Sequence, residues 1–126
     1  MIVVDSSIVI DALIGEESER KRLREEKVIA PCLIDAEVGH AVRRMVRRER
    51  FDATVGAAAL EELRRFDISM VSHDPLLVRA WELRDNASFY DALYIALAEL
   101  SGCNLVTRDA RLAGIPGIRA SVEVIA

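Results

Sequence analysis

The stretch Ile2-Val3-Val4-Asp5-Ser6-Ser7 decides the fold that we expect for the rest of the chain. Three β-branched residues in succession make a strand that is apolar on both faces, which is typical of the middle of a parallel sheet. The run ends at a carboxylate, and a charge is costly at the end of a buried strand unless something compensates it. In open α/β sheets, ligands bind at the carboxyl ends of the strands. Asp5 is therefore a candidate functional residue, although this hexapeptide alone favours a simpler role, the N-cap of a following helix.

The composition indicates one domain. A chain of 126 residues, 52% of them hydrophobic, can bury roughly two-thirds of its unfolded surface, and we expect a single domain over residues 1–126. The longest apolar run, Ala92 to Ala98, is far shorter than the roughly 18 residues that span a bilayer. With no leader pattern at the start, we expect a cytoplasmic protein without membrane contact. Cys32 and Cys103 stand alone, and we expect buried free thiols.

The charges are unevenly distributed along the chain. A formal net charge of −4 argues against a general polyanion binder. The cations are nevertheless concentrated in one segment, at Arg43, Arg44, Arg47, Arg48 and Arg50. A local basic ridge beside a local acidic pocket is compatible with this modest net charge.

Short apolar strands alternate with helices. We expect further strands at 28–30, 68–71, 105–107 and 122–125, and helices at 8–13, 16–26, 33–48, 51–65, 74–84, 88–101 and 110–112. Asp74, before Pro75, should cap one helix, and Ala57 to Ala59 should be small core residues of another. The absence of tight hairpin signals predicts an α/β fold, a three-layer α/β/α sandwich with a short-stranded parallel sheet.

Four acids interrupt apolar surroundings, namely Asp5, Glu37, Asp91 and Asp109. Two of them follow strands and two lie near helix starts, so all four can converge at one edge of a parallel sheet. Like charges in a partly buried pocket repel, and either protonation or a cation relieves the repulsion. Oxygen ligands select a hard ion such as Mg²⁺ or Mn²⁺.

Each acid also has a plain alternative. Ser88 and Asp91 form a passable capping box, which is as well supported locally as a metal role. Asp109 could be a turn residue or the cap of a short helix. Glu37 could pair with an arginine of its own helix or lie in water. These alternatives become less convincing together, because all four acids are expected at one sheet edge.

The predicted helix 33–48 carries a carboxylate and arginines on one side. At 100° per residue, Arg44 and Arg48 lie within about 20° of the direction of Glu37. On this side of the helix, Glu37 could bind a metal and the arginines farther along could bind phosphates, since a guanidinium matches phosphate geometry. The alternative for any single arginine is a solvated ridge or a salt bridge to a partner's acids.

Four segments occur in a specific order, namely Ile2 to Ser7, Ala30-Pro31 followed by Glu37, Tyr90 to Ala98, and Leu105 to Asp109. Together they resemble the PIN domain family, and within it the VapC toxin ribonucleases of prokaryotic toxin–antitoxin pairs. The resemblance covers essentially the whole chain, and no acid of the family pattern is missing. It implies a catalytic metal site for one or two Mg²⁺ or Mn²⁺ ions, formed by Asp5, Glu37, Asp91 and Asp109 with Ser7 and Thr107 as hydroxyl partners.

The resemblance also implies an activity and partners. The expected reaction is hydrolysis of RNA by a metal-activated water, which needs no histidine base and leaves 5'-phosphate and 3'-hydroxyl ends. The expected partners are an RNA substrate, a cognate VapB-like antitoxin whose C-terminal segment lies in the acidic groove, and a second copy of the chain that docks through apolar helical surface. The RNA backbone would be held by Arg44 and Arg48, with Arg43 or Arg47 at the margin.

A second functional class is a protein of the same fold that only docks a partner protein or RNA, with structural acids. Other enzyme classes find little support. Glu37 and His40 have an iron-ligand spacing, but the second copy that such a site needs is absent. Ser72-His73-Asp74 are contiguous, so their side chains point in different directions and do not form a catalytic triad. The sequence contains no phosphate-binding glycine motif.

Overall fold

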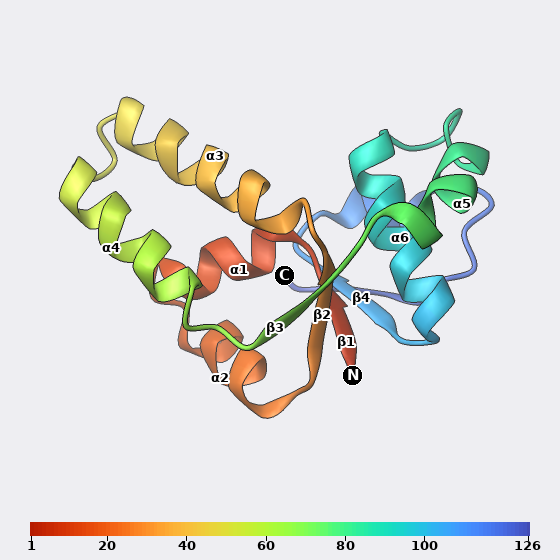
Figure 1. Ribbon diagram of the computed structural model, residues 1–126, viewed down its shortest axis with the longest axis horizontal. Coiled ribbons are helices and arrows are strands. Elements are labelled where there is room, and N and C mark those ends of the chain that lie inside the picture. Colours follow the sequence, from red (N-terminus) through yellow and green to blue (C-terminus); the bar gives the residue numbers. More distant parts are fainter.

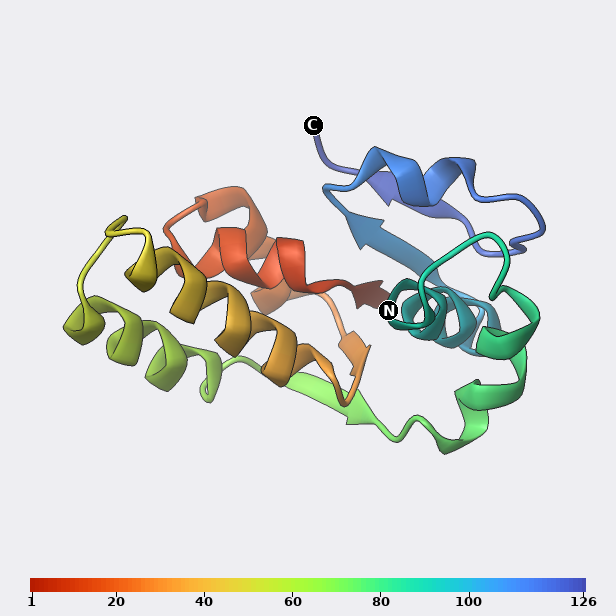
Figure 2. The same cartoon turned by 90° about the horizontal axis from the view of Figure 1, so that it is seen from above.

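The computed structural model describes residues 1–126 and contains five strands between two layers of helices (Figures 1 and 2). The strands are β1 (Ile2–Val4), β2 (Val28–Pro31), β3 (Ile68–Val71), β4 (Asn104–Thr107) and β5 (Val122–Val124). The helices are α1 (Ser6–Leu13), α2 (Glu17–Glu25), α3 (Ile34–Arg47), α4 (Ala53–Leu63), α5 (Leu77–Glu82) and α6 (Phe89–Ser101), with 3-10 turns η1 (Asp74–Leu76) and η2 (Ala110–Gly114). The predicted order of strands and helices is confirmed.

The sheet is parallel throughout, in the order β3-β2-β1-β4-β5. The first strand lies at its centre, where Val3 pairs with Ile29 on one side and with Leu105 on the other. Val3 and Val4 have no exposed surface. The apolar run at the start of the sequence is therefore the middle of the sheet, and the predicted α/β/α sandwich with a parallel sheet is confirmed.

The helices divide between the two faces of the sheet. Figures 1 and 2 show α1 to α4 on one side and α5 and α6 on the other. The buried residues Ala92 to Ala98 make α6 the central helix of its layer, in contact with β1, β2 and β4. Ser88 caps the start of α6, and Gly102 ends it in the left-handed conformation with φ of +65°.

The chain changes direction in the sheet next to β1. From β1 it builds β2 and β3 on one side, and it then crosses to build β4 and β5 on the other side. The point between β1 and β4 is thus a topological switch point, where open α/β sheets form ligand crevices beyond the carboxyl ends of their strands. Asp5 follows β1, and Arg108 and Asp109 follow β4, at this switch point.

The prediction that Ala57 to Ala59 form part of the core is wrong in detail. Ala57 and Ala58 are exposed, and Gly56 is the buried residue of α4. A Cβ atom at position 56 would lie 3.0 Å from Cγ2 of Val46, so a glycine permits the close approach of α3 and α4. The helix α4 packs against α3 and α1.

Two further local predictions are corrected. Asp74 does not cap a helix through its side chain; its N–H donates to Ser72 Oγ at 3.3 Å, within a 3-10 turn. Cys32 is exposed and Cys103 is half-buried, because each lies at the end of a strand and not within the core; both are free thiols. The structure contains no helix with both the length and the apolar character needed to cross a membrane.

Candidate functional site

Asp5 occupies the switch point as a nearly buried carboxylate, 9% exposed. Its Oδ1 accepts hydrogen bonds from the N–H of Ser7 at 3.1 Å and from Ser7 Oγ at 2.5 Å. Its Oδ2 accepts a hydrogen bond from Thr107 Oγ1 at 2.5 Å, across 102 residues of sequence. The N-cap role considered from the sequence is confirmed, and both expected hydroxyl partners contact this carboxylate.

The environment of Asp5 disfavours its charge. Burial raises the pKa of the Asp5 carboxyl, and the hydrogen bonds from Ser7 and Thr107 offset only part of that rise. No lysine or arginine forms an ion pair with it. Asp5 is therefore a buried acid for which the chain supplies hydrogen bonds but no counter-ion.

Glu37 reaches the same region from the start of α3. The Tyr94 hydroxyl donates a hydrogen bond of 2.5 Å to Glu37 Oε1, which joins α6 to α3. Burial raises the pKa of Glu37, and the negative charges of Asp91 and Asp5 raise it further, against the effect of the Tyr94 hydrogen bond. The alternative pairing of Glu37 with an arginine is not found. Glu37 therefore lies within electrostatic range of both Asp5 and Asp91.

Asp91 is held in place by its backbone. Its N–H donates to Ser88 Oγ at 3.1 Å, which is the first half of the capping box considered from the sequence. The second half is missing, because the Asp91 carboxylate accepts no hydrogen bond and forms no ion pair. The cap therefore positions the first turn of α6 while leaving the half-buried carboxylate available.

Asp109 behaves differently from the other three acids. Its N–H donates to Thr107 Oγ1 at 2.9 Å, next to Asp5. Its carboxylate, however, accepts the Arg111 N–H at 3.0 Å and pairs with the Arg111 guanidinium, Nη2 to Oδ2 at 2.5 Å. Arg111 lowers the pKa of Asp109. The helix-cap alternative is thus found, and the predicted convergence of all four acids is incomplete, because an arginine two residues away neutralises this one.

The donor set nevertheless fits a hard divalent cation. As the side chains stand, no three of the acidic, histidine and cysteine groups are close enough to share an ion. Asp5, Glu37 and Asp91 nonetheless offer carboxylate oxygens at one sheet edge, the charges of Asp5 and Asp91 repel that of Glu37, and none of the three acids forms an ion pair. All-oxygen ligands with excess negative charge are what Mg²⁺ and Mn²⁺ select.

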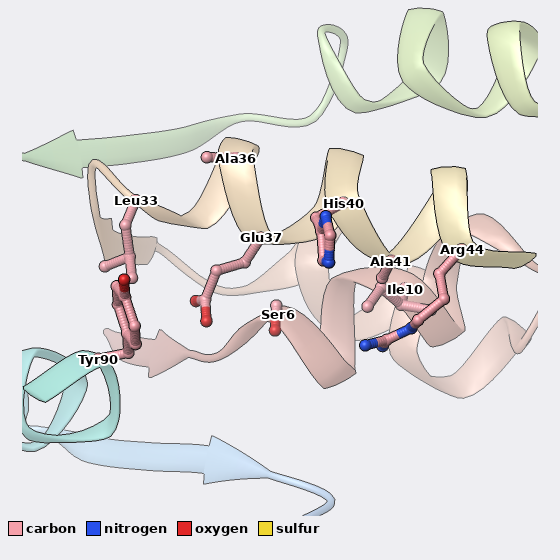
Figure 3. A pocket seen from close by; sticks show the side chains of 9 residues that line it. All are labelled: Ser6, Ile10, Leu33, Ala36, Glu37, His40, Ala41, Arg44 and Tyr90. Carbon is pink, nitrogen blue, oxygen red and sulfur yellow. The ribbon is translucent and has the colours of Figure 1, made fainter. Parts of the chain in front are cut away.

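A cleft of about 510 Å³ extends from Glu37 along α3. Figure 3 shows Glu37, His40 and Arg44 following one another on α3, opposite Ser6 and Ile10 of α1. Arg44 is exposed and forms no ion pair. The shared side of Glu37 and Arg44, predicted from helical spacing, is confirmed by their place in one cleft. The remaining lining residues are Leu33, Ala36, Ala41 and Tyr90.

The predicted basic ridge is divided between two sides of α3. Arg43 and Arg47 line a separate cavity of about 380 Å³ between α3 and α4, away from the cleft of Arg44. Arg48 is the exposed C-cap residue of α3. None of these arginines forms an ion pair within the chain. Only Arg44 is placed beside Glu37, because successive residues of a helix point in different directions.

Sequence reasoning missed Tyr94, Tyr90 and Ser6 as site residues, and it considered His40 only for an iron-ligand spacing. His40 is exposed and lines the cleft between Glu37 and Arg44. The spacing of Asp91 and Tyr94, three residues apart on α6, is a signal that could have identified Tyr94, because such residues share one helix face.

Comparison with known proteins agrees with the fold and the motif order. Residues 2–118 match the family model of the PIN domain. The chain is 41% identical over 128 residues to Ribonuclease VapC1 of Mycobacterium tuberculosis, covering 98% of this chain and 96% of that one. It is 38% identical over 125 residues to VapC ribonuclease Mb0985 of Mycobacterium bovis, covering 99% and 98%.

The fold is also shared with a solved structure, VapBC2 from Rickettsia felis bound to a DNA fragment from its promoter. The TM-score is 0.72 with 16% identity, covering 98% of both chains. This likeness concerns the fold alone. With a parallel sheet, a carboxylate at its switch point, and relatives that align over nearly their whole length, the chain belongs to the PIN domain family.

Proposed function

We propose that this chain is a metal-dependent endoribonuclease and the toxin of a toxin–antitoxin pair. The observation that carries the proposal is the group of Asp5, Glu37 and Asp91, in which Glu37 lies within electrostatic range of the other two acids and none of the three forms an ion pair within the chain. The relatives at 38–41% identity are named ribonucleases, which supports a nuclease.

The residues that would hold the metal are Asp5, Glu37 and Asp91, and Asp109 after release from Arg111. When bound, Mg²⁺ or Mn²⁺ supplies a water of lowered pKa and stabilises the charge that develops on the phosphodiester oxygens. Ser7 and Thr107 keep the Asp5 carboxylate fixed, each through a hydrogen bond of 2.5 Å. This fixed geometry is what a metal ligand requires.

The cleft provides a path for the RNA backbone. Arg44 lies along α3 from Glu37, and its guanidinium is free to form two parallel hydrogen bonds to a phosphate. Arg48 is exposed farther along the same helix and extends the positive surface. Arg43 and Arg47 face α4, and we therefore assign them no more than a long-range electrostatic effect on RNA.

The expected protein partners are an antitoxin and a second copy of the chain. The relatives at 38–41% identity carry VapC names, and the neighbour of the same fold from Rickettsia felis is VapBC2, so we expect a VapB-like partner for this chain. Leu77, Val78 and Trp81 on α5 are exposed apolar side chains that a homodimer would cover. The alternative function remains a domain of this fold that only docks a partner protein or RNA.

The decisive experiment replaces Asp5 or Asp91 by asparagine, which retains the size of the side chain and removes its charge. We expect Mg²⁺-dependent RNA cleavage to fall by at least about a thousandfold, because several kcal/mol of transition-state stabilisation depend on the metal. Circular dichroism should show an unchanged fold. Asp67→Asn is the matched control, because Asp67 is exposed and distant in sequence from every acid of the site. Cleavage that survives both substitutions would reject the catalytic assignment, and an unchanged protein that cleaves no RNA would favour the docking function.

The RNA path is tested by Arg44→Ala with Arg43→Ala as the control. Loss of one phosphate contact should raise KM for RNA and reduce the slope of log affinity against log salt by about 0.7 for a single strand. Arg43→Ala removes the same charge from the other side of α3 and should leave the slope nearly unchanged. Equal effects of the two substitutions would show that the arginines act only through net charge.

A further inference from the structure

Tyr94 is the most deeply buried polar side chain near the acids, apart from Thr107. Its side chain is 2% exposed, and its neighbours Leu93 and Ile95 are buried as well. The only hydrogen bond of its hydroxyl group goes to Glu37 Oε1, at 2.5 Å and across 57 residues of sequence. Tyr94 also lies three residues after Asp91, on the same face of α6. One buried residue of the helix that carries Asp91 thus holds the carboxylate of Glu37.

We propose that Tyr94 is a positioning residue of the metal site, which fixes one carboxylate oxygen of Glu37 and leaves Oε2 to bind the cation. This inference rests on the proposed function. Glu37 Oε2 accepts no hydrogen bond and forms no ion pair, whereas Oε1 accepts the hydrogen bond of Tyr94. The glutamate is therefore presented with one oxygen held and one oxygen free.

Glu37 needs such a restraint more than Asp5 does. Asp5 has a short side chain and is held by Ser7 and Thr107 on both oxygens. Glu37 has one more rotatable bond, lies at the open cleft, and is repelled by Asp5 and Asp91. Without the hydroxyl of Tyr94, repulsion and rotamer entropy would both favour turning the carboxylate toward water.

The position of Tyr94 makes it an effective restraint. Its ring lies within the continuous buried segment of α6, so the hydroxyl group is fixed by the packing of the helix against the sheet. A hydrogen bond to a carboxylate is short and about twice as strong as one between neutral groups. Partners that orient metal ligands in this way typically change metal affinity by about 10–100-fold when they are removed.

Tyr94→Phe tests the proposal, because it removes only the hydroxyl group and keeps the ring. Titration calorimetry with Mn²⁺ should show a Kd at least about tenfold weaker than that of the unchanged protein. Ser69→Ala is the control, since it also removes only a hydroxyl group, at an exposed residue of β3 that lies outside the cleft and whose side chain forms no hydrogen bond; its Kd for Mn²⁺ should stay within about twofold. An unaltered Kd for Tyr94→Phe, with normal Mn²⁺ binding and RNA cleavage by the unchanged protein, overturns the role of Tyr94 and leaves the proposed function intact.

A double-mutant cycle distinguishes positioning from packing. If the hydroxyl acts through Glu37, adding Tyr94→Phe to a Glu37→Gln protein should cause little further loss of Mn²⁺ affinity. A full additional tenfold loss would mean that Tyr94 acts independently of Glu37 and would overturn the inference. An unchanged protein that neither binds Mn²⁺ nor cleaves RNA would overturn the proposed function together with it.

A spectroscopic measurement avoids dependence on the folding of Tyr94→Phe. In the Tyr90→Phe protein, Tyr94 is the one remaining tyrosine. Titration of this protein with Mg²⁺ should shift its tyrosine absorbance, because the cation changes the charge on the acceptor of the Tyr94 hydroxyl. A saturated metal site with no change in tyrosine absorbance would contradict the proposed contact.

Discussion

The two ends of α6 carry acids in opposite situations. At its first turn, Asp91 lies near Asp5 and Glu37, and none of the three pairs with a cation. At its last turn, the Glu99 carboxylate pairs with the Arg79 guanidinium, with hydrogen bonds from Nε to Oε2 at 2.9 Å and from Nη2 to Oε1 at 3.0 Å. The N–H of Arg119 also donates to Oε1, at 3.0 Å.

The pKa values of these acids shift in opposite directions. Arg79 and the Arg119 N–H lower the pKa of Glu99 although burial opposes them, whereas burial and neighbouring charges raise the pKa values of Asp5 and Glu37. The chain thus supplies its own cation where an acid has a structural role. An acid group without such a cation is a candidate for binding an ion from solution, and three predictions test this distinction.

The largest expected effect concerns the structural acid. Arg79→Ala should lower the free energy of unfolding by about 2 kcal/mol, roughly thirtyfold in the equilibrium constant, because it leaves Glu99 without a counter-ion. This value allows for the partial exposure of the pair, whose side chains are 21% and 10% exposed. Urea denaturation measures it.

The control for this prediction is the exposed pair of Arg64 and Glu61, whose side chains are 76% and 58% exposed. Arg64→Ala should change stability by less than about 0.5 kcal/mol. If both variants lost the same free energy of unfolding, burial would not explain a difference in strength between the two ion pairs. RNA cleavage by both variants should persist, because neither arginine lies at the candidate site.

The second prediction concerns the acids without a counter-ion. In EDTA at neutral pH, the double variant Asp5→Asn, Glu37→Gln should be more stable than the unchanged protein by about 1 kcal/mol, because two unfavourable charges are removed. Asparagine still caps α1, and glutamine can still accept the Tyr94 hydrogen bond. In saturating Mg²⁺, the unchanged protein should instead be more stable than the double variant, since only the unchanged protein would be stabilised by binding the ion.

The pH dependence of this difference has a definite sign. The folded-state pKa values of Asp5 and Glu37 are raised above their usual 3.8 and 4.5, so the folded protein takes up protons first as the pH falls. The stability advantage of the double variant is complete above these raised values and shrinks as the pH falls through them. The contribution of the Glu99 pair is instead lost as the pH falls from 4.5 through the lowered pKa of Glu99. An advantage that grew toward low pH would contradict the assignment.

The smallest expected effect concerns Asp109, the one candidate ligand that the chain does neutralise. Arg111 is 82% exposed at its side chain, so it is a weak competitor for the carboxylate. Arg111→Ala should tighten Mn²⁺ binding by about twofold in titration calorimetry. Arg65→Ala, at an exposed arginine without an ion pair, should have no effect. Weaker binding in Arg111→Ala would instead show that Arg111 orients Asp109 for the metal.

The sequence by itself determined the elements and the chain positions of the acids. The apolar run before Asp5 predicted the central strand, and the continuous apolar segment Ala92 to Ala98 predicted the buried helix, both correctly. These features depend on residues a few positions apart, because strand and helix periodicity place near neighbours on the same or opposite faces.

The tertiary structure alone decided which side chains meet. The bond from Thr107 to Asp5 depends on the pairing of β1 with β4, and the bond from Tyr94 to Glu37 depends on where α6 and α3 lie on opposite faces of one sheet. Such contacts join residues far apart in sequence, and local periodicity contains no information on strand order or helix placement.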